Sequence, residues 1–173
     1  KKVSGYIADT QRCYQGNYYA IFPQLSLSGD LGSGISNQMV LLLNSFGMGK
    51  TDTDNDNLTV TPFMQTSDSG YAVTENDQTQ GQYILGAVST NAISADSSDS
   101  DSEDEDDESD ATDTDTKTAR LTVLASASMI SSDITDQLTT LDNLTLFVNS
   151  VTENFDNVNN VAIEAKSLST ETN

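Results

Sequence analysis

Six residues in the middle of the chain, Asp52-Thr-Asp-Asn-Asp-Asn57, have a spacing that could bind a metal ion. Carboxylates at alternate positions open the calcium-binding loop of EF-hand proteins, where they turn oxygen atoms toward Ca²⁺. That loop also requires a glycine at its sixth position and a glutamate at its twelfth, but this chain has Asn57 and Phe63 there. The pattern is compatible with a weak Ca²⁺ site, and an exposed Asp/Asn loop is the simpler interpretation. The candidate metal ligands are Asp52, Asp54 and Asp56.

A second candidate site consists of hydroxyl and carboxyl groups that follow two predicted strands. Sheets of the α/β class bind ligands beyond the ends of their strands, so these groups could hold a small polar ligand through hydrogen bonds. Hydrogen bonding within ordinary turns explains the same residues. The candidate ligand-binding residues are Ser67, Asp68, Ser69, Ser126 and Ser128.

The chain offers no set of residues for nucleophilic catalysis. It contains no histidine, so neither a Ser–His nor a Cys–His pair can form within it, and no imidazole can bind zinc. Cys13 follows Arg12 but has no candidate base beside it. Gly49-Lys-Thr51 matches only the end of a phosphate-binding loop, because Asn44 stands where the first glycine is required. The sequence predicts a protein that is not an enzyme.

Charge excludes two classes of partner. The formal net charge is −20, and 12 of the 27 acidic residues lie between Asp96 and Asp115, a tract without a basic or aromatic residue. A chain with so few clustered Lys and Arg residues is not expected to bind nucleic acid or anionic lipid. Like charges repel and nothing apolar can collapse, so residues 94–117 are predicted to form a disordered acidic low-complexity loop.

The elements that position these groups are centred on residues 118–155. Residues 120–125 are apolar and β-branched, as in a strand, and a polar turn follows. Asp142 is a candidate N-cap for an amphipathic helix. Four apolar residues of that helix, at i, i+3, i+4 and i+7, are predicted to face the core. They are Leu144, Phe147, Val148 and Val151.

Five more segments have strand-like composition, and Tyr18 and Tyr19 in the first of them are expected to place one ring on each face. Six strands and one clear helix predict an α/β fold, a layered sheet of about five to six strands with few helices. At 173 residues the chain fits one domain, 1–173. The five segments are 17–22, 38–43, 58–64, 82–88 and 161–166.

The chain starts Lys-Lys-Val-Ser-Gly, without a methionine and without the apolar core of a signal peptide. No window reaches the roughly 18 apolar residues of a membrane span. We therefore expect a piece of a longer protein whose membrane anchor and signals lie outside this chain.

Three stretches taken together resemble a known family. They are Tyr18-Tyr-Ala-Ile-Phe-Pro23, Leu58-Thr-Val-Thr-Pro-Phe-Met-Gln-Thr-Ser-Asp-Ser-Gly-Tyr71 and the unit 118–151. Their order and spacing are similar to the extracytoplasmic region of GldG-type proteins, auxiliary components of uncharacterised ABC transport systems associated with gliding motility. The chain departs from the family at Ser126 and Ser128, where relatives often carry two acids in a turn.

This resemblance implies a non-catalytic extracytoplasmic binding module that works with an ABC permease and ATPase and is anchored in the membrane by segments outside this chain. It also implies a flavodoxin-like or amidotransferase-like sheet, whose open strand edges would allow a homodimer. No cofactor is expected apart from weak Ca²⁺, for which the residues of the Asp52–Asn57 segment are the candidates. The alternative function is a calcium-stabilised structural or adhesion domain at the cell surface.

Overall fold

The largest part of the fold is a four-stranded antiparallel sheet with the order β10-β9-β6-β4. The computed structural model describes residues 1–51, 54–93 and 117–155. β6 alternates apolar and polar residues from Leu58 to Thr61, the pattern of a strand with one covered face, whereas Leu85-Gly-Ala-Val88 of β9 is apolar and buried throughout. Its strands are β4 (Gln24–Leu25), β6 (Leu58–Gln65), β9 (Ile84–Ile93) and β10 (Lys117–Leu124).

Pro62 lies inside β6, where it removes one N–H donor from the ladder. The register of β6 against β9 shifts between Pro62 and Met64, and β4 pairs with β6 only at Met64 and Gln65. A proline is tolerated in a strand at such an irregular, partly unpaired position. The predicted strand 58–64 is therefore confirmed as β6.

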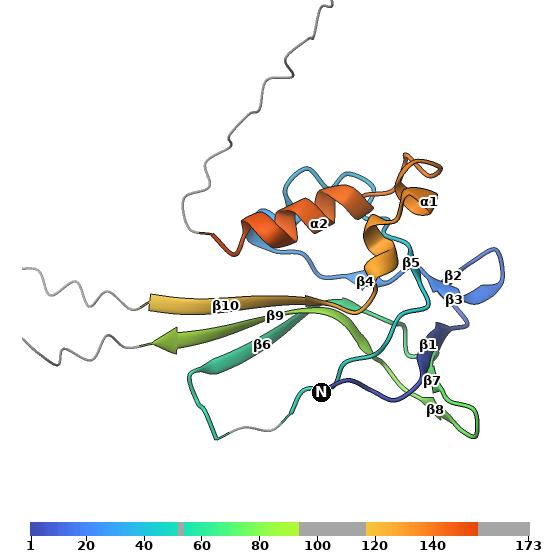
Figure 1. The fold of residues 1–173 in the computed structure, drawn as a ribbon, viewed down its shortest axis with the longest axis horizontal. Helices are drawn as coiled ribbons and strands as arrows, with labels where there is room; N and C mark the ends of the chain where they lie inside the picture. The colour runs from blue at the N-terminus through green and yellow to red at the C-terminus, as the bar shows by residue number, and fades with distance from the viewer. Residues whose placement is uncertain (52–53, 94–116, 156–173) are drawn as a thin grey trace, which may run out of the picture.

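Two smaller antiparallel sheets gather at one end of the long strands (Figure 1). In the first, β1 pairs with β7 and β7 pairs with β8. In the second, β3 lies between β2 and β5. The strands of the first are β1 (Tyr6–Asp9), β7 (Gly70–Val73) and β8 (Gln78–Gln80). Those of the second are β2 (Cys13–Tyr14), β3 (Asn17–Ile21) and β5 (Leu42–Leu43).

The helical segments lie along one side of the long strands (Figure 1). The side chains of Arg120 and Glu153, 2.6 Å apart, and of Thr122 and Asn154, 3.1 Å apart, join β10 to the end of the last helix. These segments are η1 (Gly29–Gly32), η2 (Ala127–Ile130), α1 (Ser132–Thr135) and α2 (Asn143–Thr152). The buried core joins them to all three sheets through Ile7, Ile21, Leu31, Leu42, Phe63, Leu85, Met129 and Leu146.

The predicted α/β class, with a flavodoxin-like or amidotransferase-like layered sheet, is wrong. The described residues form three antiparallel sheets of three or four strands and only two short α-helices. A layered α/β sheet needs parallel strands joined by helical crossovers. Here β9 and β10 pair antiparallel, and α2 follows the last described strand instead of connecting two strands.

The predicted helix exists as α2, but most of its predicted core face points to solvent. Leu144, Val148 and Val151 are 56%, 48% and 43% exposed. The buried residues of α2 are Asn143, Leu146 and Ser150, and Phe147 is half-buried against the core.

Two polar residues can face inward on α2 because the surrounding backbone satisfies them. The amide of Asn143 donates to the carbonyls of Leu41 and Met129 and accepts from the N–H of Leu41. The hydroxyl of Ser150 donates to the carbonyl of Phe147. Apolar periodicity identified the helix correctly, but it could not show that the other face carries these bonds.

The other predicted strands are confirmed only in part. The predicted strands 17–22, 82–88 and 120–125 are confirmed as β3, β9 and β10, whereas only Leu42–Leu43 of 38–43 is a strand. The predicted strand 161–166 and the acidic loop lie outside the described residues, except that Lys117 begins β10. Over the described residues, no helix is long and apolar enough to cross a membrane.

Candidate functional site

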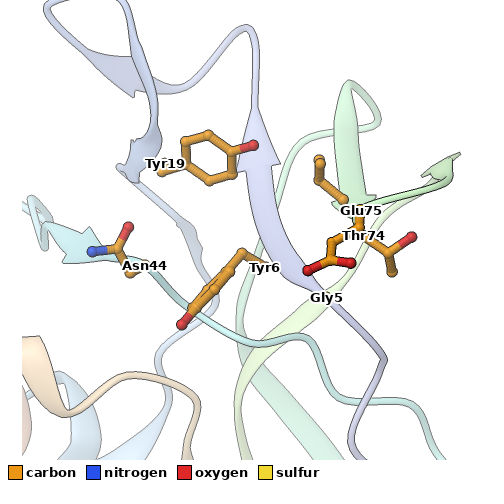
Figure 2. A pocket seen from close by; sticks show the side chains of 7 residues that line it. Gly5, Tyr6, Tyr19, Asn44, Thr74 and Glu75 are labelled. Atoms are coloured by element: carbon orange, nitrogen blue, oxygen red, sulfur yellow. The ribbon is translucent and has the colours of Figure 1, made fainter.

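A pocket of about 580 Å³ opens where β1, β3 and the β7–β8 turn meet. We call it the tyrosine pocket, after the two rings that line it. In Figure 2, the rings of Tyr6 and Tyr19 lie between Asn44 on one side and Thr74 and Glu75 on the other. The pocket is lined by Gly5, Tyr6, Tyr19, Asn44, Val73, Thr74 and Glu75.

Close pairing of β1 with β7 forms one wall of this pocket. Tyr6 pairs with Val73, and Gly5 just before it has φ +85°. A Cβ atom on Gly5 would lie 2.2 Å from the carbonyl oxygen of Val73, so only glycine fits. This approach brings the turn at residues 74–77 beside the start of β1.

The opposite wall comes from β3 and the end of β5. The N–H of Asn44 donates to the carbonyl of Tyr19 at 3.0 Å, which fixes the two residues side by side. Asn44 has φ +49°, in the left-handed region that asparagine enters more readily than most residues. Its side chain therefore leaves the strand direction and lines the pocket.

Tyr6 is held by an aromatic stack. Its ring lies 4.8 Å from the ring of Phe46, at an interplanar angle of 27°. The ammonium group of Lys2 lies 3.4 Å from the centroid of Phe46, a cation–π contact. Phe46 thus covers one face of the Tyr6 ring, although 48% of Tyr6 is exposed.

The polar groups of the pocket are available to a ligand. Within the described part of the chain, the hydroxyls of Tyr6 and Tyr19, the amide of Asn44 and the carboxylate of Glu75 make no hydrogen bond or ion pair. The hydroxyl of Thr74 is already used, since it donates to the carbonyl of Asp77 and accepts from the N–H of Asp77. Those two bonds close the turn that carries Glu75.

The first group of predicted ligand-binding residues has a structural role. Ser67 is buried, and both its N–H and its hydroxyl donate to the carboxylate of Asp9, at 2.7 and 2.8 Å. The N–H of Ser69 donates to the hydroxyl of Ser67. Asp68 is exposed, and its carbonyl accepts from Gln80. These bonds join the turn after β6 to β1.

Asp9 is a buried carboxylate at the centre of that arrangement. Burial raises the pKa of this carboxyl group, but the N–H groups of Arg12, Ser67 and Gln11 and the Ser67 hydroxyl together hold the pKa below its usual value of 3.8. The ionised form is therefore the form that the fold selects.

Ser126 and Ser128 likewise complete the structure. The hydroxyl of Ser126 donates to the carbonyl of Leu43, and the hydroxyl of Ser128 accepts from the N–H of Leu43. The two hydroxyls lie 2.7 Å apart. They supply the hydrogen bonds to the backbone of Leu43 that a neighbouring strand would otherwise make at the end of β5. Neither these serines nor Ser67 and Ser69 line the tyrosine pocket.

The candidate calcium ligands are only partly described. Asp54 and Asp56 are exposed, and Asp52 lies outside the described residues. The side chain of Asn55 accepts from the N–H of Asn57 in the turn that leads into β6. Over the described residues no group of three or more His, Cys, Asp or Glu side chains is placed to hold a metal ion.

The sequence did not predict the tyrosine pocket, and both rings of the Tyr18–Tyr19 pair are exposed, at 50% and 37%. Tyr6, Asn44 and Glu75 are far apart in the chain. The pairing of β1 with β7 brings the turn of Glu75 beside Tyr6, and the N–H of Ile7 donates to the carbonyl of Ser45, the residue after Asn44. No periodic signal marks such residues.

Among known proteins, no family model, no curated protein and no solved structure matches this chain.

Proposed function

We propose that this domain is a non-catalytic binding module whose ligand occupies the tyrosine pocket. The observation that carries this proposal is the exposure of two tyrosine rings together with four polar groups that have no partner among the described residues. Tyr6 and Tyr19 are 48% and 37% exposed on strands whose backbones are fixed by pairing. Aromatic walls with a few convergent polar groups are typical of binding pockets.

The test compares two neighbouring tyrosines. Tyr19→Ala removes a wall of the pocket, whereas Tyr18→Ala removes a ring that is 50% exposed but does not line it. The probes are short peptides that contain Arg or Lys, tetramethylammonium chloride and neutral glucose oligosaccharides. Tyrosine fluorescence reports binding directly, because the chain has 6 Tyr and no Trp.

We expect at least one probe to bind the native chain, with binding weakened by Tyr19→Ala and unchanged by Tyr18→Ala. If no probe binds, or if the two variants lose affinity equally, the tyrosine pocket is not a binding site. Circular dichroism of each variant tests whether the fold is retained.

The setting that we propose is outside the cell membrane, beside an ABC permease and ATPase. Its support is the resemblance of three stretches to GldG-type proteins, without the α/β fold that the resemblance implied. A pull-down from cell envelope, with the parent protein carrying or lacking this domain, tests it. Co-purification of a permease and an ATPase is expected, and their absence from both samples would remove this setting.

The calcium-stabilised surface domain is the competing function. It depends on Asp54 and Asp56 together with Asp52, and a thermal melting scan with and without Ca²⁺ separates the two functions. A higher midpoint in Ca²⁺ would mean that the folded state binds the ion and would favour the competing function.

A further inference from the structure

We infer that the tyrosine pocket binds an organic cation, an ammonium or guanidinium group held by the two tyrosine rings and the carboxylate of Glu75. This inference rests on the proposed function and specifies the ligand of the same pocket.

Glu75 brings a negative charge to the pocket. Its carboxylate has no counterion among the described residues, whose one salt bridge joins Arg120 to Glu153. No basic residue lines the pocket. A bound cation would supply the missing partner, whereas a bound anion would face an uncompensated carboxylate.

The two tyrosine rings offer aromatic faces to a ligand. Aromatic faces attract cations within about 6 Å of the ring centroid. The same aromatic stack already holds one cation, because the ammonium group of Lys2 lies 3.4 Å from the centroid of Phe46, which in turn stacks on Tyr6. A ligand cation over Tyr6 or Tyr19 would repeat a contact that this part of the molecule makes internally.

The charge of the whole chain also favours a cation. A formal net charge of −20 produces a negative potential that attracts cations and repels anions, and it affects neutral ligands little. The potential does not select a site, but it raises the local concentration of cations around the pocket. Charge and local geometry therefore favour the same class of ligand.

A metal ion is a poor match for this pocket. Calcium takes six to eight oxygen ligands and magnesium requires a nearly octahedral set. The lining offers one carboxylate, one amide, two phenol hydroxyls and the Thr74 hydroxyl, which is already bonded to Asp77, beside the aromatic ring faces. An organic cation needs fewer oxygen atoms and gains from the rings, since guanidinium is planar, weakly hydrated and able to pair with a carboxylate while it stacks.

The experiment uses matched probes on the full chain. An acetylated Gly-Arg-Gly amide is compared with the same peptide carrying citrulline, which keeps the shape of arginine and lacks its charge. The lysine peptide and tetramethylammonium chloride distinguish a side chain of a partner polypeptide from a free small cation. Tyrosine fluorescence and NMR signals of the tyrosine rings report binding.

Two pairs of variants separate the pocket from general electrostatics. Glu75→Gln removes the pocket carboxylate, and Asp133→Asn removes the same charge from the exposed surface of α1. Tyr19→Phe keeps the ring that Tyr19→Ala removes. The acidic tract is intact in all four variants, so cation binding to the tract does not change between them.

We expect the arginine peptide to bind about tenfold or more tightly than the citrulline peptide. We expect Glu75→Gln to weaken it about tenfold, and Asp133→Asn and Tyr19→Phe to change it less than about twofold. Affinity should fall as salt is added. Equal binding of both peptides, or equal effects of Glu75→Gln and Asp133→Asn, would overturn the inference.

Failure of this inference differs from failure of the proposed function. A neutral oligosaccharide whose binding depends on Tyr19 but not on Glu75 would retain the binding module and remove the cation. If Tyr19→Ala affects no probe, both the module and the cation are wrong.

Discussion

Asp9 is a buried residue whose carboxylate holds the surrounding backbone in place. Its carboxylate accepts hydrogen bonds from the N–H groups of Gln11 and Arg12, which follow β1, and from the N–H and hydroxyl of Ser67. These bonds hold the backbone that follows β1 and the turn at Ser67, which leads into β7. The candidate ligand role of Ser67 becomes a structural one for the same reason.

Replacing Asp9 with Asn should destabilise the domain by about 2–4 kcal/mol, because an amide nitrogen would oppose backbone N–H groups that now meet an acceptor. Asp68→Asn, a change on an exposed neighbour in the same region, should stay within about 0.5 kcal/mol. Urea unfolding followed by circular dichroism measures both. A loss of less than about 1 kcal/mol for Asp9→Asn would contradict the role that we give it.

The pH dependence of stability follows from the direction of the Asp9 pKa. Its folded pKa lies below 3.8, so the unfolded chain binds the proton more readily. The stabilisation from Asp9 is complete above this usual value and is lost as the pH falls through the folded pKa. Unfolding midpoints measured between pH 6 and pH 2 should decline in this acidic range, and the decline should be smaller in Asp9→Asn.

At the scale of elements, α2 shows a helix whose apolar stripe and buried face differ. Asp142 precedes α2 as predicted, but its carboxylate accepts from the N–H groups of Asn37 and Met39 instead of capping the helix. Asn143 then joins α2 to residue 41 and to η2. These long-range hydrogen bonds set the rotation of α2 about its axis.

Leu146→Ala should cost about 2–5 kcal/mol, since Leu146 is fully buried and its removal leaves a cavity. Leu144→Ala, two residues earlier on the same helix, should change stability by less than about 0.5 kcal/mol, since Leu144 is exposed. Both substitutions preserve helix propensity, so burial is the main difference between them. Equal losses in denaturant unfolding would mean that Leu144 is covered.

How much the sequence can predict also depends on the element. β6, β9 and β10 were predictable because each carries a run of alternating or apolar β-branched residues. β7 and β8 were missed because Gly70–Val73 and Gln78–Gln80 have weak strand composition and are strands through pairing with neighbours. The strand order was not predictable, since the composition of a strand does not name its partner.

The candidate site was less predictable than the fold. Serine pairs after strand ends suit a ligand site and a structural turn equally well, and the structure uses Ser126 and Ser128 for the end of β5. The tyrosine pocket depends on Gly5, whose contact with Val73 is a tertiary feature. A single sequence carries no sign of such a contact.

At the scale of the whole molecule, charge is divided unequally along the chain. The 12 acidic residues between Asp96 and Asp115 lie between β9 and β10 in sequence, and these two strands are joined by an eight-pair register. β9 and β10 are therefore neighbours in the sheet although a long acidic segment separates them in the sequence.

Replacing residues 94–116 with a five-residue Gly/Ser turn should stabilise the domain by about 1 kcal/mol. The sequence predicts a solvated loop, and closing a shorter loop costs less entropy. Removal of clustered negative charge should add to the effect at low salt and less at high salt. Unfolding at two salt concentrations measures both contributions, and destabilisation by the replacement would show that the tract makes contacts with the folded domain.

Ile93, the last residue of β9, pairs with Lys117, the first residue of β10. The polypeptide leaves β9 at Ile93 and enters β10 at Lys117, directly opposite, and eight residue pairs hold the two strands in register from there. A protease site engineered between these positions should yield, after cleavage, two fragments that stay associated, elute together and unfold in one concentration-dependent transition. The domain would then behave as a split protein, whose two fragments associate through the pairing of β9 with β10, the buried core and the hydrogen bonds of Asp142 and Asn143 to residues 37–41.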